Sequence, residues 1–174
     1  KIVKAQDHMG VFQYESNLAL RLMKDIIPSN FEELSAVSSL LRPGPLQMGM
    51  DKEFANRKHG RPDENGHVWT KDEIPLCIRS ILEPTHGIIV FQEQFMRIGM
   101  KIGGLGNAEV NAFRKALVKY SKGQEAEAKR YSQVESYHQT FVKNACLPEN
   151  LGSREEAEKL WDLIASFAKY GFNK

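Results

Sequence analysis

Basic side chains gather on a helix that is expected to follow Gly106. At about 100° per residue, one face of this helix is apolar and consists of Val110, Phe113 and Leu117. The opposite face is basic and carries Lys115, Lys119 and Lys122, with Arg114 at its side. Such a row can neutralise successive phosphate oxygens of a triphosphate or a nucleic-acid backbone. On pattern alone, however, a solvated helix surface is the commoner reading.

Two other basic groups lie where helices are expected to end. Arg42 precedes a Pro-Gly-Pro sequence, a stiff turn that could hold a guanidinium in a fixed direction. Arg57, Lys58 and His59 stand in what should be the last turn of a short helix. Both groups also fit an ordinary role, because cations interact favourably with the last carbonyls of a helix. We treat all four as candidate contacts to DNA or nucleotide.

Two glutamines, Gln92 and Gln94, follow four apolar residues at 88–91 and flank Glu93. If the amides are buried they need hydrogen-bond partners, and they could read a base or brace a loop. The alternative is an exposed helix start at which Glu93 complements the helix dipole. Both glutamines join the candidate contacts to DNA or nucleotide.

The composition is that of an ordinary globular protein. The chain has 174 residues, 41% of them hydrophobic and 26% charged, with a formal net charge of +2. We expect one domain, residues 1–174, with a subdivision possible near 60–76. Any nucleic-acid surface must then come from local clustering of Lys and Arg. Cys77 and Cys146 are far apart in the sequence and read as reduced thiols of a cytoplasmic protein.

Several signatures of enzymes and membrane proteins do not occur in the sequence. The five histidines lack metal-ligand spacing, and we find no Asp-x-Asp pair, P-loop, GxSxG or GxGxxG. His138 lies in an apolar stripe and is expected to be a satisfied core residue. No apolar run approaches the length of a membrane span. We therefore expect no metal site and no catalytic residue within the chain, whose ends look cut from a longer protein.

Helical periodicity predicts a mainly α fold, a multi-helix module with at most a short hairpin or strand. Ser16 is an expected helix cap, and Ser29 with Glu32 and Ser153 with Glu156 are expected capping boxes. Further helices are expected around residues 50–58, 95–102, 110–120, 131–145 and 153–167.

The turns between these helices are expected from Pro and Gly. Pro43 should end the helix that begins after Ser29, and Gly44-Pro45 should form a rigid turn. Residues 60–75 are the expected place for a small hairpin or a variable insertion. Residues 88–91 fit either a brief strand or the buried start of the next helix.

Strings along most of the chain, in order, resemble one family, the bacterial replicative C-family DNA polymerases (polymerase III alpha subunits). These strings are Asp7-x-x-Gly10-Val11-Phe12-Gln13-x-Glu15-Ser16, Phe31-Glu32-Glu33-Leu34, Arg42-Pro43-Gly44-Pro45-Leu46, Arg57-Lys58-His59-Gly60-Arg61, Ile81-Leu82-Glu83-Pro84-Thr85-x-Gly87, Gln92-Glu93-Gln94, Arg114-Lys115-Ala116 and Phe167-Ala168-x-Tyr170-Gly171-Phe172-Asn173-Lys174. The resemblance implies that the chain is the fingers region of such a polymerase.

In that family the fingers close over the incoming dNTP and its template base, and the catalytic carboxylates lie in the palm. The resemblance implies two-metal nucleotidyl transfer with two magnesium ions in the intact active site. Arg114 and Lys115 match the family's paired arginines and become the expected triphosphate ligands, with Lys119 and Lys122 as further candidates. Asn173 and Lys174 match the start of a family Asn-Lys-Ser-His string and are also expected to bind nucleotide.

The chain also departs from the family pattern. Lys115 stands where the second arginine is usual and lacks bidentate geometry. His86 and Phe91 replace tyrosines, and residues 62–76 match poorly. After the paired basic residues, the family's Gly and three lysines are replaced by the sequence from Val118 to Gly123. These differences indicate a divergent member.

The sequence therefore predicts the fingers part of a DNA-directed DNA polymerase. The implied partners are primer-template DNA, dNTPs, the palm and thumb of the same polymerase, and replisome proteins, without a membrane. Residues 1–174 alone are expected to give no primer extension. The alternative reading is a non-catalytic, polymerase-derived helical module for DNA binding or protein interaction.

Overall fold

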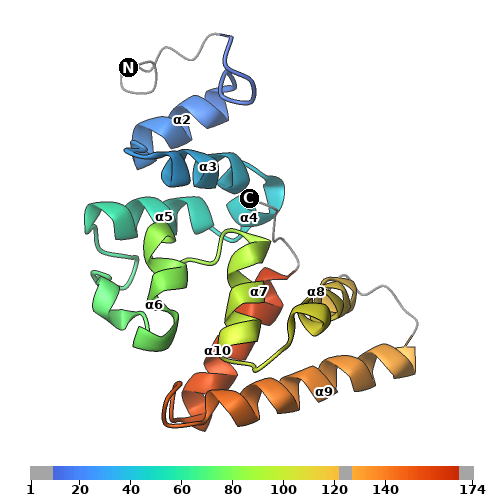
Figure 1. Cartoon of the computed structure of the whole chain (residues 1–174). Coiled ribbons are helices and arrows are strands. Elements are labelled where there is room, and N and C mark those ends of the chain that lie inside the picture. The colour runs from blue at the N-terminus through green and yellow to red at the C-terminus, as the bar shows by residue number, and fades with distance from the viewer. Residues whose placement is uncertain (1–9, 122–126, 169–174) are drawn as a thin grey trace. The chain divides into compact units, whose positions relative to one another are not determined.

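The computed structural model describes residues 10–121 and 127–168, without the side chains of residues 119–121 and 127–131 (Figure 1). In this part of the chain the regular structure is helical and no β-strand forms, which confirms the predicted mainly α fold. The elements are α2 (Asn17–Ile26), α3 (Phe31–Leu40), α4 (Pro43–Gln47), α5 (Met50–His59), the 3₁₀ turn η1 (Lys71–Glu73), α6 (Leu76–Leu82), the 3₁₀ turn η2 (Glu83–Thr85), α7 (Gln92–Lys101), α8 (Asn107–Ser121), α9 (Glu127–Ala145) and α10 (Arg154–Phe167).

The chain forms two compact units, which are described separately. Unit 1 comprises Lys1–Ile74 and Leu82–Val90, and unit 2 comprises Pro75–Ile81 and Phe91–Lys174. The chain therefore leaves unit 1 after Ile74, returns at Leu82 and leaves it again after Val90. Unit 1 contains α2 to α5 with both 3₁₀ turns, and α7 to α10 belong to unit 2.

Two of the predicted helix caps are present. The Ser16 hydroxyl accepts a hydrogen bond from the Ala19 N–H at 3.1 Å and begins α2. The Ser153 hydroxyl accepts from the Glu156 N–H at 3.5 Å and begins α10. Both serines satisfy a backbone donor that has no partner within its helix, which is why these residues start helices.

The predicted capping box at Ser29 and Glu32 is wrong by one residue. The cap of α3 is Asn30, whose Oδ1 accepts from the Glu33 N–H at 2.8 Å. The carboxylate that returns is that of Glu33, and it accepts from the Ser29 N–H at 2.7 Å. Asn and Ser are equally favourable helix N-caps. With the cap at Asn30, the carboxylate that binds the preceding backbone belongs to the buried Glu33 and not to the exposed Glu32.

The predicted rigid turn at Gly44-Pro45 is also wrong. Pro43 does end α3, since Arg42 is extended at φ −84° and ψ 151°. Residues Pro43–Gln47 then form the short helix α4 with Pro43 at its first position. Proline fits there because its φ suits a helix and the missing N–H would have no helical partner.

No strand forms in the segment for which a small hairpin was expected. Instead, Asp63 organises a turn: its Oδ1 accepts from the Asn65 N–H at 2.8 Å and the His67 N–H at 2.9 Å. Residues 88–90 form no regular element, and Phe91 makes only a single β-bridge. Phe91 is extended and is the N-cap of α7, which begins at Gln92.

The carboxylate of Glu33 on α3 is buried in the core of unit 1, with 5% of its side chain exposed. Its Oε2 accepts from the Ser29 hydroxyl at 2.9 Å and from Lys58 Nζ on α5 at 2.6 Å. Its Oε1 lies 3.2 Å from His86 Nε2, just after η2. The start of α3, the last turn of α5 and the segment after η2 meet at this group, so the Glu33 carboxylate joins three segments in one place. We call Glu33, Ser29, Lys58 and His86 the Glu33 cluster.

Opposing effects set the charge states in the Glu33 cluster. Burial by itself raises the pKa of Glu33, but hydrogen bonds from Lys58 and Ser29 outweigh it and lower that pKa from 4.5 to about 2. Burial lowers the pKa of His86, against the opposing effect of Glu33. At neutral pH Glu33 is therefore ionised and His86 is neutral, and the His86 Nε2–H donates to the carboxylate.

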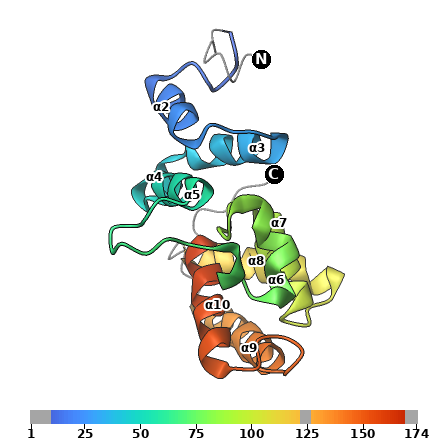
Figure 2. The same ribbon diagram turned by 90° about the vertical axis from the view of Figure 1, so that its left-hand side faces the viewer.

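The core of unit 2 is aromatic and centres on Phe113 of α8, which is fully buried. Its ring meets Phe95 of α7 at a centroid distance of 6.3 Å, Tyr137 of α9 at 5.4 Å and Trp161 of α10 at 5.9 Å. Edge-on and tilted aromatic pairs add about 0.5–1.5 kcal/mol each beyond area burial. Because this one ring meets rings from three neighbouring helices, it fixes the rotation of α8. Figure 2 shows α7, α8, α9 and α10 grouped in unit 2.

We predict that Glu33→Gln lowers the free energy of unfolding of this chain by roughly 3 kcal/mol at pH 7. The reason is that Lys58, with 11% of its side chain exposed, loses its counter-charge. Because the pKa of Glu33 is lower in the folded state, its contribution is complete above about pH 4.5 and is lost as pH falls through about 2. Urea denaturation between pH 2 and pH 7 measures the difference.

The matched control is Glu32→Gln, on the exposed neighbouring residue of the same helix turn. It removes the same charge near the N-terminus of α3 and should cost less than about 1 kcal/mol. Equal losses for both variants, or a loss for Glu33→Gln that does not shrink in acid, would contradict the prediction.

Candidate functional site

Arg114 and Lys115 lie on α8 directly after the buried Phe113. Inward residues of α8 are buried, with Val110 3% and Leu117 1% exposed. Arg114 is half-buried at the side of the helix and Lys115 is exposed. The predicted helix, its apolar face and the lateral place of Arg114 are therefore all found. Their role in binding nucleotide stays a prediction.

Arg114 is brought together with another candidate residue, Gln92. Its Nη1 donates to Gln92 Oε1 at 3.3 Å, so the first residue of α7 accepts a hydrogen bond from the middle of α8. The two residues are 22 positions apart in the chain. A guanidinium has five N–H donors, so this one bond leaves others that can meet a ligand oxygen. Gln92 therefore holds one side of the Arg114 guanidinium, which is only half-buried.

Gln94 is a buried amide that braces the backbone, whereas Glu93 is exposed at the start of a helix, so each of the two expected roles is found at one residue. Gln94 is buried, and its side chain accepts from the Phe91 N–H at 2.9 Å and donates to the Ile81 carbonyl at 3.1 Å. It therefore braces the stretch of chain that leads into α7, between Ile81 and Phe91. Glu93 is exposed in the first turn of α7, where a negative charge complements the helix dipole.

Four of the expected nucleotide-binding residues lie outside what the structure describes. They are Lys119, whose side chain is not described, and Lys122, Asn173 and Lys174. Their predicted roles are carried forward from the sequence alone.

Arg42 lies in unit 1, at the cap of α4. It lines a surface hollow of about 410 Å³ together with residues that lead into α2 and residues of α3; the lining residues are Gln13, Glu15, Ser16, Leu18, Ser38, Leu41 and Arg42. Arg42 is therefore exposed beside other polar side chains of the hollow, and its role as a contact to DNA or nucleotide stays a prediction.

Arg57 of α5 makes three interactions within unit 1. Its Nε donates to Glu53 Oε1 at 2.7 Å, and its Nη1 donates to the His86 carbonyl at 3.3 Å. The guanidinium also lies 5.2 Å from the ring centroid of Trp69, within cation–π range. The neighbouring Gly87, at φ +79°, is tightly enclosed, since a Cβ there would lie 2.7 Å from the Trp69 ring.

The last turn of α5 is joined to the end of α2 by its other two candidate residues. Lys58 Nζ donates to the Ile27 carbonyl at 2.6 Å in addition to its bond with Glu33. His59 Nε2 lies 3.0 Å from the Asp25 carbonyl and 3.1 Å from the Ile26 carbonyl. Carbonyls at a helix end lack helical partners, so the Lys58 ammonium and the His59 ring N–H satisfy them. The sequence pattern suggested carbonyls of the same helix, and the structure shows those of another.

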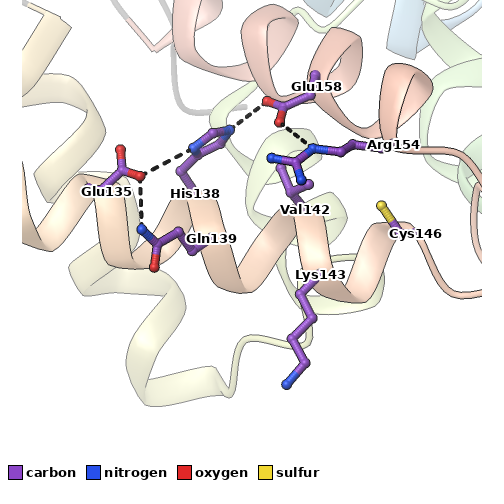
Figure 3. Close-up of a pocket in the computed structure, with 8 residues that line it drawn as sticks. All are labelled: Glu135, His138, Gln139, Val142, Lys143, Cys146, Arg154 and Glu158. Carbon is purple, nitrogen blue, oxygen red and sulfur yellow. Dashed lines mark hydrogen bonds and ion pairs between the residues drawn. The ribbon is translucent and has the colours of Figure 1, made fainter.

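Unit 2 also has a pocket of about 450 Å³ between α9 and α10, which the sequence did not indicate (Figure 3). Its walls carry charged and polar groups: Glu135, His138, Gln139, Lys143, Arg154 and Glu158, with Val142 and Cys146. His138 Nε2 donates to Glu158 Oε2 at 2.6 Å, and its hydrogen bond is the main cause that lowers the pKa of Glu158.

His138 was expected in the core, and it lies at the margin of it. Its ring packs 4.9 Å from the Trp161 ring, but a quarter of the side chain is exposed to the pocket. Arg154 Nε also lies 3.5 Å from Glu158 Oε1, so Glu158 is shared between His138 and Arg154 in this pocket. Only the packing of α9 on α10 reveals the arrangement, because its members are far apart in sequence.

Within the described part of the chain, neither a metal centre nor a membrane span was found. Among residues 10–121 and 127–168, no three His, Cys, Asp or Glu side chains converge to hold a metal ion, so these residues do not fit a magnesium pair. In the same part of the chain, none of the helices combines the length and the apolar character that crossing a bilayer requires.

Comparison with known proteins gives consistent relatives. Residues 1–140 match the family described as bacterial DNA polymerase III alpha subunit finger domain. The chain is 38% identical over 176 residues to DNA polymerase III subunit alpha of Helicobacter pylori (strain ATCC 700392 / 26695), covering 100% of this chain and 13% of that protein. It is 36% identical over 178 residues to the protein of the same name from Escherichia coli (strain K12), covering 99% and 14%.

This chain thus spans 13–14% of the length of these curated relatives. The family match covers most of the chain, including unit 1 and the α7–α8 pair that holds Gln92 and Arg114. The chain therefore belongs to the family of bacterial DNA polymerase III alpha subunit finger domains.

Proposed function

We propose that this chain is the fingers part of a replicative DNA-directed DNA polymerase and binds the triphosphate of the incoming dNTP. Its membership of the finger-domain family supports this proposal. The observation that carries it is Arg114, a half-buried guanidinium on a rigid helix with one donor held by Gln92. Buried aromatic packing beside it limits movement, so its remaining donors can meet phosphate oxygens at a constant position.

Lys115 acts beside Arg114 as a second cation. It is exposed on the same helix and presents three N–H donors on a flexible stem, so it tolerates variation in phosphate position. In our proposal Lys119, Lys122, Asn173 and Lys174 extend this binding surface. Closure of the fingers brings these cations to a correctly paired dNTP, which couples base selection to assembly of the active site.

We assign the reacting groups to other parts of the polymerase. The described residues do not fit a magnesium pair, so we route no chemical step through this chain. Its contribution is to bind and orient the nucleotide for attack by the primer 3′-hydroxyl. Primer-template DNA, dNTPs and the palm and thumb are the partners this role requires, in the cytoplasm where bacterial chromosomes are copied.

We give Arg57, Lys58, His59 and Gln94 a supporting role in this function. Support for this comes from their bonds, since each joins segments of its own unit through backbone carbonyls or buried carboxylates. They hold the helices from which the exposed cations project.

We predict that Arg114→Ala in the full-length polymerase raises KM for dNTP roughly 10- to 100-fold, the range for losing hydrogen bonds from a charged group. Steady-state primer extension at saturating DNA measures KM and kcat. The control is Lys159→Ala, which removes an exposed cation of α10 paired only with Glu155 among the described residues. A KM for Arg114→Ala equal to that of the control would remove Arg114 from the site.

We further predict that Gln92 acts through Arg114 and does not touch the nucleotide. Gln92→Met keeps the side-chain length but lacks the acceptor, so KM should rise less than in Arg114→Ala, by about 3- to 10-fold. In the double variant, Gln92→Met should add nothing to Arg114→Ala. Additive increases in KM would indicate that Gln92 contacts DNA or nucleotide independently.

A further inference from the structure

Unit 1 has a surface hollow of about 580 Å³ between α2 and α5. It is lined by Arg21, Leu22, Lys24, Asp25, Asp51 and Lys52. Arg21 and Lys24 are three residues apart on α2 and therefore share one face of that helix. Lys52 comes from the first turn of α5. We call this feature the α2/α5 hollow.

The three cations of the hollow are exposed and make no hydrogen bond or ion pair with any residue that the structure describes. The acidic residues offset them only in part. Asp25 is already paired, since its Oδ1 accepts from Arg61 Nη1 at 2.8 Å. Asp51 is buried, with 7% exposed, and has no described ion pair. Three cations thus face one uncompensated carboxylate, and the hollow carries an excess of positive charge.

The spacing of these cations is held by the core of unit 1. His59 and Lys58 bind the carbonyls that end α2, and Lys58 is itself held by the Glu33 cluster. The last turn of α5 is therefore joined to the end of α2, while Lys52 lies in the first turn of α5. A ligand with several linked negative charges gains from such a fixed set, because the protein loses little freedom on binding.

We propose that the α2/α5 hollow binds the phosphodiester backbone of nucleic acid. This rests on the proposed function, which supplies DNA as the polyanion. Arg21 can take two phosphate oxygens with its planar guanidinium, while Lys24 and Lys52 act as point charges on adjacent phosphates. The cations are on two helices, so the backbone lies across α2 and α5. The contacts are to phosphate, so they position the strand without reading its sequence.

The test is the salt dependence of DNA binding by the full-length polymerase. Each neutralised phosphate contributes about 0.9 to the slope of log K against log salt on duplex DNA and about 0.7 on a single strand. The variant Arg21→Ala/Lys24→Ala/Lys52→Ala should reduce this slope by about 2–3 and weaken binding roughly 10-fold or more at low salt. KM for dNTP at saturating DNA should not change.

The matched control is Arg97→Ala/Lys101→Ala/Lys143→Ala, which removes one arginine and two lysines, all exposed, from unit 2. Circular dichroism melting confirms that both triple variants fold. The slope should change only for the α2/α5 variant. Equal changes in both variants would show a general effect of net charge and would overturn the proposal, as would no change in either.

Two DNA substrates distinguish the strand that is bound. If the hollow holds the duplex, the loss appears with a primer-template that has a short overhang; if it holds the template strand, the loss appears only with a long overhang. Either result supports a phosphodiester site. If the wild-type protein bound neither DNA, the proposed function would fall together with this inference. Normal binding by the triple variant beside a raised KM in Arg114→Ala would overturn the α2/α5 hollow alone.

Discussion

The ionised carboxylate of Glu33 is the interaction on which unit 1 depends. A buried charge is costly unless partners surround it, and here hydrogen bonds from Ser29, Lys58 and His86 supply them. The same bonds join the start of α3, the last turn of α5 and the segment after η2. Lys58 extends the network to the end of α2. One buried charge therefore links α3, α5 and the segment after η2, and through Lys58 it also reaches the end of α2.

Unit 2 is organised by apolar contact instead. Phe113 meets aromatic rings from α7, α9 and α10, and this packing sets the rotation of α8. Arg114 and Lys115 follow Phe113 directly, so they must project to the side and the outside of the same helix. The two units use their basic residues differently. Several cations of unit 1 hold its helices together, whereas on α8 Lys115 is exposed and Arg114 is half-buried, with one donor bound by Gln92.

Local signals in the sequence were sufficient for the helices and for most of their ends. Ser16, Ser153 and Gly60 mark helix ends by chemistry that acts within a few residues. The errors arose where two local solutions compete. Asn30 and Ser29 can both cap α3, and Pro43 can either stop one helix or begin another. Which solution forms depends on where Glu33 and α4 pack, and that information is not local.

The sequence by itself determined the mainly α fold, the apolar face of α8, the lateral place of Arg114 and the family. These follow from helical periodicity and from residue strings that are continuous in the chain. Only the tertiary structure decided which polar residues are engaged. Gln94 and Lys58 are bound to groups 13 and 25 residues away, while Gln92 reaches Arg114 across 22 residues. Hydrogen bonds between distant segments depend on helix packing, which no local pattern encodes.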